Sequence, residues 1–174
     1  MTVSPAMRRY AAEIYRLQQD HDLVPLAILS AHINASAQAI ATMVKRLSKS
    51  GYLTYEPYRG IRLTRTGERI AMPALRRHRL TEAFLVKVMK YDWASAHELS
   101  DVFEKGVNDE LEDRMFELAG QPTRCPHGEP IPSKEGVMPT VEDEQLSHVP
   151  SGSDCIASRV RTHDMDKLRY IAEI

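Results

Sequence analysis

In the first fifty positions, apolar residues recur at the three- and four-residue steps typical of amphipathic helices. Tyr10, Ile14 and Leu17 predict a first helix with one apolar face. Pro25 suits the first turn of a helix, so we expect a short second helix through Leu29.

A turn at residues 33–36 separates this second helix from a third amphipathic stretch. Ser36 is a good N-cap, because its hydroxyl can accept a hydrogen bond from a backbone N–H of the first turn. Gly51 can supply the left-handed conformation that ends a helix. The positions expected to be buried are Ile40, Met43, Val44 and Leu47.

Two short β-prone runs follow, at residues 52–56 and 61–64, on either side of a Pro/Gly turn at residues 57–60. This pattern predicts a β-hairpin. Three helices followed by a two-stranded hairpin is the element order of a winged helix-turn-helix.

The helical pattern resumes at Thr66, with a possible kink at Pro73, and continues to about Lys90. A further helix is expected over roughly residues 94–118, with apolar residues at four-residue steps. These are Phe103, Val107, Leu111 and Met115.

Residues 122–139 contain five prolines, which predicts an extended connector rather than a regular element. In the last stretch, residues 156–160 are expected to form a strand and residues 167–174 a helix.

Charge divides the chain into two unlike halves. Residues 1–90 hold fifteen Lys/Arg and six Asp/Glu, a net of +9, whereas residues 91–174 hold eight and eighteen, a net of −10. A basic first half suits a polyanion, and an acidic second half suits cations or contacts between copies of the chain. We expect a cytoplasmic protein without membrane contact, because no apolar run approaches the roughly 18 residues of a membrane span and no secretory signal is present. Two cysteines, Cys125 and Cys155, are too few for a disulfide framework.

In a helix-turn-helix, the second helix of the pair lies in the major groove and its N-terminal residues meet base edges. The residues expected at base edges are Ser36, Gln38, Ala39 and Thr42. Those expected at phosphates are Lys45, Arg46 and Lys49 on the helix, with Arg59 and Arg62 on the hairpin. The alternatives are a solvated basic face or a winged helix that binds protein.

Metal-ligating residue types gather in four downstream segments. They are His78 and Glu82; His97, Asp101 and Glu104, with Lys105 next on the same predicted helix face; Cys125 and His127; and His163 and Asp164. Imidazole, carboxylate and thiolate from separate segments suit a transition metal. Taken singly, each has a simpler explanation: a surface hydrogen bond for the His/Glu pair, or packing or pairing with Cys155 for Cys125.

With these residues in place, the chain resembles the diphtheria toxin repressor and manganese transport regulator family of metal-dependent repressors. The stretches that carry the resemblance are residues 55–64, 77–82, 97–104 and 125–132. The resemblance implies a homodimer whose binding to operator DNA is favoured by Mn(II) or Fe(II). Zn(II) would also bind in vitro, since it forms tighter complexes with such ligands.

The resemblance also implies a mainly α architecture in three parts. A winged helix-turn-helix DNA-binding domain covers residues 1–65. A helical dimerisation and metal-binding domain with its connector covers residues 66–140. A partial SH3-like β domain covers residues 141–174, either shortened in the gene or cut from a longer chain.

Residue by residue, His78, Glu82 and His97 match the family's ancillary metal site. Cys125 and His127 match further ligands used by members with the same connector motif. His163 or Asp164 matches a donor from the third domain.

The family's primary metal site is altered in this chain. Asp101 and Glu104 match its carboxylates. On the first helix, however, Arg9 replaces the usual Asp or Met, and Ala12 occupies the position three residues later where relatives can have an acidic ligand. Lys105 replaces a His. We therefore expect Arg9, Asp101, Glu104 and Lys105 to form a salt-bridged cluster, with metal confined to the other ligands. Alternatively, Arg9 and Lys105 turn outward.

Two other functions remain open. The first is a winged-helix regulator whose metal site is vestigial. The second is a zinc hydrolase, since His97-Glu98 begins a pattern like the His-Glu-x-x-His helix of zinc proteases, although Asp101 replaces the second histidine.

Overall fold

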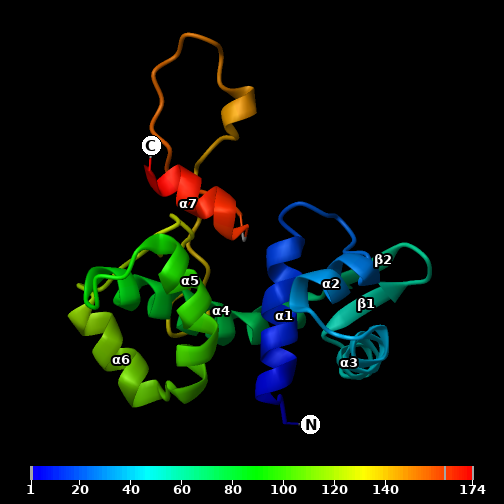
Figure 1. Ribbon diagram of the computed structural model, residues 1–174. Helices are drawn as coiled ribbons and strands as arrows, with labels where there is room; N and C mark the ends of the chain where they lie inside the picture. The colour runs from blue at the N-terminus through cyan, green and yellow to red at the C-terminus, as the bar shows by residue number, and fades with distance from the viewer. Residues whose placement is uncertain (1, 163, 174) are drawn as a thin grey trace. The chain divides into compact units, whose positions relative to one another are not determined.

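The computed structural model describes residues 2–162 and 164–173. The chain divides into two compact units on either side of the Leu75–Arg76 junction. Figure 1 shows the elements of both units along the chain.

The first unit has the expected order of three helices and a hairpin. Its elements are α1 (Pro5–Leu17), α2 (Leu26–Ile33), α3 (Ala37–Lys49), β1 (Leu53–Glu56) and β2 (Gly60–Leu63), followed by the start of α4 (Arg65–Lys87). Ser36 caps α3 as predicted, and Ser4 caps α1 in the same way. The largest fully buried side chains of this unit include Met7, Ile14, Leu29, Ile40, Leu47 and Ile61.

The hairpin is antiparallel and pairs Leu53 with Leu63 and Glu56 with Gly60. Gly60 has a φ of +146°, and a Cβ at this position would lie 2.6 Å from the Val24 carbonyl oxygen. Only glycine fits that approach without displacing backbone, so the start of β2 packs directly on the segment that precedes α2.

The second unit contains the rest of α4, then α5 (Trp93–Phe103), the 3₁₀ turn η1 (Glu104–Gly106), α6 (Asp109–Leu118), η2 (Leu146–His148) and α7 (Met165–Glu173). The helix expected over residues 94–118 is therefore wrong as a single element. Asn108 starts α6 anew, because its side chain accepts a hydrogen bond from the Leu111 N–H at 2.9 Å. The break changes which residues are buried: Val107 and Met115 pack with Leu80, whereas Phe103 and Leu111 are exposed.

The connector at residues 122–139 has no helix or longer strand, as predicted, and only an isolated bridge joins Arg124 to Pro130. The strand expected at residues 156–160 is wrong, since the described part of residues 141–173 contains no strand. Instead, the Val160 N–H donates to the His127 carbonyl oxygen at 2.8 Å. The last helix begins at Met165, two residues earlier than expected. The assignment of this region to an SH3-like domain stays a prediction.

Among the described residues, no single helix is long and apolar enough to cross a membrane; α2 and α3 pass that test only as a pair, bent by 113°.

Candidate functional site

The exposed face of α3 carries the side chains predicted to meet DNA. Ile40, Val44 and Leu47 line the opposite, buried face. The predicted DNA-contacting residues are all exposed: Ser36, Gln38, Ala39, Thr42, Lys45, Arg46, Lys49 and, on the hairpin, Arg59.

Two hydroxyls on this face are engaged within the helix itself. The Ser36 Oγ accepts from the Ala39 N–H at 3.2 Å, and the Thr42 Oγ1 donates to the Gln38 carbonyl oxygen at 2.8 Å. If α3 lies in the major groove as predicted, Gln38 would meet a base with its side-chain amide and Thr42 with its methyl group. These are the contacts that suit adenine and thymine, respectively.

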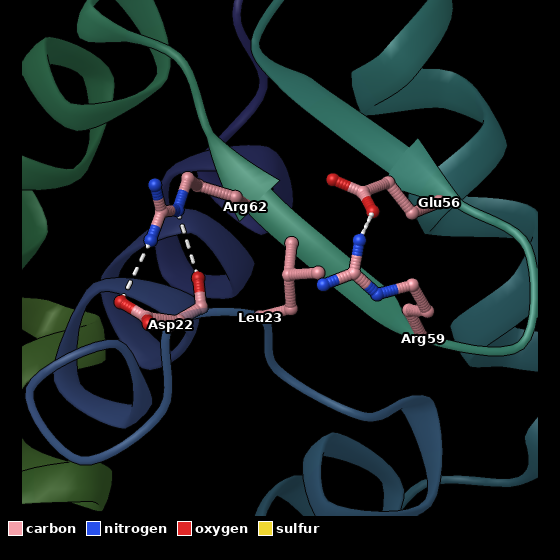
Figure 2. Close-up of a pocket in the computed structure, with 5 residues that line it drawn as sticks. All are labelled: Asp22, Leu23, Glu56, Arg59 and Arg62. Atoms are coloured by element: carbon pink, nitrogen blue, oxygen red, sulfur yellow. Dashed lines mark hydrogen bonds and ion pairs between the residues drawn. The ribbon is translucent and has the colours of Figure 1, made fainter.

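The two arginines of the hairpin are paired with acids around an open pocket of about 520 Å³. Arg59 Nη1 lies 2.5 Å from Glu56 Oε2 within the hairpin. Arg62 donates to both the carbonyl and the carboxylate of Asp22, at 2.8 and 3.0 Å (Figure 2). Arg62 therefore fastens β2 to the segment before α2, whereas the Arg59 pair stays within the turn.

The predicted metal ligands of the second unit lie around Glu82. This carboxylate is 3% exposed. Its Oε1 lies 3.3 Å from His78 Nε2 one turn earlier on α4 and 2.8 Å from His97 Nδ1 on α5. Asp92 sets the start of α5 by accepting from the Ser95 N–H. The i,i+4 spacing of His78 and Glu82 thus places both on one face, as predicted.

The connector approaches the other oxygen of Glu82. His127 Nδ1 lies 3.5 Å from Glu82 Oε2 and 3.9 Å from Cys125 Sγ. A tight turn holds the two side chains there, with hydrogen bonds from Cys125 N–H to Glu129 O and from Gly128 N–H to Cys125 O, both 2.9 Å. His78, His97 and His127 are far apart in the sequence but all lie beside the Glu82 carboxylate.

The electrostatics of this cluster favour a charged Glu82 and a neutral thiol. Burial by itself raises the pKa of Glu82, but the neighbouring His78 and hydrogen bonds from His127 and His97 hold it well below its ordinary value. Burial, together with the charge of Glu82, raises the pKa of Cys125 far above that of an exposed thiol.

A divalent metal ion fits this donor set. The donor atoms fall into two groups, and within each group they lie within 4.8 Å of one another. One group is His78, Glu82 and His97, and the other is Glu82, Cys125 and His127. His127 Nε2 is buried and has no hydrogen-bond partner among the described residues, which is uncommon for a buried polar atom. Imidazole, carboxylate and thiolate are all ligands of first-row transition metals, and a bound ion would compete with the proton on sulfur.

A third group of donor atoms lies at Nδ1, the other ring nitrogen of His78. His78 Nδ1 is 3.0 Å from Glu104 Oε2 and 3.5 Å from Asp101 Oδ1. Lys105 is exposed, and so is Arg9, which lies in the first unit. The salt-bridged cluster with Arg9 stays a prediction, but His78 now links Asp101 and Glu104 to the Glu82 group.

Two further donors were predicted from the chain end, His163 and Asp164. His163 lies outside the described residues. Asp164 caps α7, because its Oδ1 accepts from the N–H groups of Asp166 and Lys167 at 3.1 and 3.2 Å. Cys125 is buried, Cys155 is exposed and both are free thiols, so the structure holds no disulfide between them. A pair formed on oxidation stays a prediction.

Sequence reasoning missed a set of buried arginines beside the metal-ligating residues. Arg79 donates to the Pro130 carbonyl oxygen at 2.6 Å and to Glu129 at 3.0 Å. Arg76 donates to the Pro132 carbonyl oxygen and to Glu112, both at 2.8 Å. These contacts hold the connector against α4. The available signal was the run of three arginines and a histidine at residues 76–79. Four consecutive helical residues point around most of the helix, so they cannot all face solvent on a helix that packs against a core.

Comparison with known proteins gives a consistent result over most of the chain. Residues 2–61 match the N-terminal DNA-binding domain of iron-dependent repressors, and residues 64–133 match their metal-binding and dimerisation domain. The chain is 29% identical over 152 residues to the iron-dependent repressor IdeR of Mycobacterium tuberculosis, an alignment that covers 83% of this chain and 66% of the relative. It therefore spans slightly less than two thirds of that relative's length.

Two solved structures are similar over nearly the whole chain. One is a manganese-dependent transcriptional repressor in complex with manganese, at 33% identity and a TM-score of 0.86, covering 96% of this chain and 77% of that one. The other is IdeR of T. acidophilum, at 28% identity and a TM-score of 0.85, covering 99% and 80%.

Proposed function

The chain belongs to the iron-dependent repressor family, and on that premise we propose that it is a metal-responsive transcriptional repressor. It binds operator DNA as a homodimer in the cytoplasm and controls genes of metal-ion homeostasis. The observation that carries the proposal is the buried Glu82 carboxylate, which shares its two oxygens between histidines of two helices and a Cys/His turn.

Glu82 is the central ligand of the proposed metal site. His78 and His97 lie beside its Oε1 atom, and His127, grouped with Cys125, lies beside its Oε2 atom. A bound divalent ion supplies positive charge in a site where Glu82 and the Cys125 thiolate would otherwise repel each other. The protein contributes donors from α4, α5 and the connector, so a bound ion would add direct bonds between three segments that already meet at Glu82.

Mn(II) or Fe(II) is the proposed physiological effector. The support comes from two similar proteins: one is a manganese-dependent repressor in complex with manganese, and the other is an iron-dependent repressor. Zn(II) should bind more tightly in vitro, because affinity of nitrogen and sulfur ligands rises along the first-row series. Metal availability in the cell rather than raw affinity then selects the effector.

The proposed DNA interface is the exposed face of α3. Gln38 and Thr42 read base edges, while Lys45, Arg46 and Lys49 neutralise phosphates. A homodimer would present two copies of α3 to a twofold-symmetric operator. We propose no catalytic role for the protein. Glu98, the candidate base of the hydrolase alternative, is exposed, and its carboxylate lies 3.8 Å from Arg169 instead of facing Glu82 and its histidines.

Apolar side chains left exposed in the second unit support the dimer. They are Leu99, Val102 and Phe103 on α5 and Leu111 and Leu118 on α6. Apolar side chains left exposed on two helices of one unit suit an isologous twofold contact between copies of the chain. A monomer in sedimentation velocity at micromolar concentration would contradict it.

The deciding experiment is DNA binding by the metal-stripped chain before and after addition of Mn(II) or Fe(II). The probe is a fluorescent duplex of the region upstream of its own gene. We expect metal to tighten binding at least about fivefold, the lower range of allosteric coupling. Glu82→Gln should abolish the metal effect, whereas Glu98→Gln, an exposed carboxylate nearby in sequence, should keep it. Equal affinity with and without metal would favour a regulator with a vestigial site.

A further inference from the structure

Tyr58, at the tip of the β1–β2 hairpin, is the most conspicuous side chain that neither the core nor the metal site uses. It is 105% exposed, more than any other large hydrophobic residue among those described. Its backbone has a φ of +64°, a left-handed conformation that bulky residues rarely adopt. Glycine or asparagine would fill the position at lower conformational cost, so tyrosine here is not explained by folding.

The turn that presents Tyr58 is fixed at its base. The backbones of Val24 and Ile61 exchange two hydrogen bonds, at 2.8 and 3.0 Å. Arg62 donates twice to Asp22 (Figure 2). Gly60 packs against the Val24 carbonyl. These contacts join the base of the hairpin to the segment before α2 and so restrict the direction in which the tip projects.

The same hairpin is bonded to the end of α3. The Tyr52 N–H donates to the Leu47 carbonyl oxygen at 3.0 Å, and the Thr64 hydroxyl donates to the Gly51 carbonyl oxygen at 2.8 Å. These hydrogen bonds make α3 and the hairpin one rigid unit. Docking α3 on a duplex fixes where the tip lies.

We propose that Tyr58 is a DNA-contacting residue, whose ring packs on a deoxyribose and whose hydroxyl donates to a phosphate of the duplex beside the groove that α3 occupies. The proposal rests on the proposed function and extends its interface from α3 to the hairpin tip. A duplex is favoured over a protein partner because Arg59 is the next residue and is itself exposed. Its pair with Glu56 is also exposed, so the guanidinium can exchange that carboxylate for a phosphate. Tyrosine is a regular donor to phosphate and sugar in protein–DNA complexes.

The test uses Tyr58→Gly, which relieves the strained backbone while removing the side chain. A residue that served only the turn would leave DNA binding unchanged. For a DNA contact, we expect the Tm of Tyr58→Gly to stay equal or rise, while its Kd for the upstream duplex weakens about fivefold, the value of one good hydrogen bond. Tyr58→Asn, which also tolerates this backbone, should weaken binding similarly, and Tyr58→Phe should fall between.

The salt dependence separates Tyr58 from its charged neighbour. Because tyrosine is neutral, Tyr58→Gly should leave the slope of log K against log salt unchanged, whereas loss of a phosphate-bound cation lowers it by about one. Binding by Tyr58→Gly within twofold of wild type would overturn the inference. So would a changed sedimentation coefficient with unchanged Kd, which would mark Tyr58 as a contact between protein chains. If wild type itself bound no duplex under any metal, the proposed function would fail first and this inference with it.

Discussion

The hairpin and the second unit use the same interaction, an arginine paired with a carboxylate, in opposite settings. On the hairpin, Arg59 and Glu56 have side chains 71% and 45% exposed. In the second unit, Arg76 and Glu112 are only 8% and 10% exposed, and Arg79 pairs with Glu129 at 7% and 20%. Exposed pairs contribute little to stability and can exchange partners, whereas a buried pair is costly to break.

This difference matches the task of each region. At the hairpin, the proposed phosphate contact requires Arg59 to leave Glu56, and a weak, exposed pair allows this. Around the metal-ligating residues, Arg76 and Arg79 must keep the connector at a fixed distance from Glu82. The two regions therefore differ in how firmly their charges are held. Four substitutions test this, from the largest expected effect to the smallest.

Glu112→Ala should have the largest effect, because it leaves Arg76 buried without its carboxylate. We expect the free energy of unfolding to fall by about 3 kcal/mol or more, measured by urea denaturation of the metal-free chain. The matched control is Glu117→Ala on the same helix. Its partner Arg114 and Glu117 itself are 65% and 61% exposed, so it should cost about 0.5 kcal/mol or less. Equal effects of the two variants would remove the distinction between the regions.

Arg79→Lys should weaken the metal site without removing any proposed ligand. Lysine keeps the charge but cannot bond Pro130 and Glu129 together with the geometry of a guanidinium. We expect metal affinity to fall roughly 10- to 100-fold, as for other residues that orient metal ligands. Co(II) titration, followed by the sulfur-to-metal charge-transfer band of Cys125, measures it. Arg77→Lys is the control, and an affinity for Co(II) equal to wild type in Arg79→Lys would contradict the positioning role.

Lys45→Ala should weaken binding of all duplex sequences about equally and lower the salt slope by about one. The physical reason is loss of one phosphate contact rather than loss of base reading. Gln38→Ala, in contrast, should relax the sequence preference at one position. Fluorescence anisotropy at several salt concentrations distinguishes them, and an unchanged slope for Lys45→Ala would mean that α3 is placed wrongly.

Glu56→Ala should have the smallest effect on stability, about 0.5 kcal/mol or less. DNA affinity should rise by a small factor, because Arg59 is released and one negative charge near the duplex is gone. Thermal unfolding and anisotropy report the two quantities separately. Weaker DNA binding by this variant would show that Glu56 holds Arg59 in its binding position instead of competing for it.

The elements of the first unit follow from local sequence. Periodic apolar positions, the Ser36 cap and the Pro/Gly turn determined three helices and a hairpin, because each signal acts within a few residues. The ligand types His78, Glu82, His97, Cys125 and His127 were also recognisable, from helical spacing and family resemblance. The break between α5 and α6 could have been found as well, since Asn108 precedes three acidic residues, the usual start of a helix.

Other features depended on contacts between distant segments. The run at residues 156–160 has strand composition, but a strand needs a partner, and in the described chain Val160 found only the His127 carbonyl. That Glu82 divides its two oxygens between separate donor groups depends on how α5 and the connector pack against α4. The roles of Arg76 and Arg79 depend on the same packing, because a buried cation is stable only where carboxylates and carbonyls meet it. Sequence thus determined the parts and their chemistry, while tertiary structure decided which charges are held fast and which remain free to exchange.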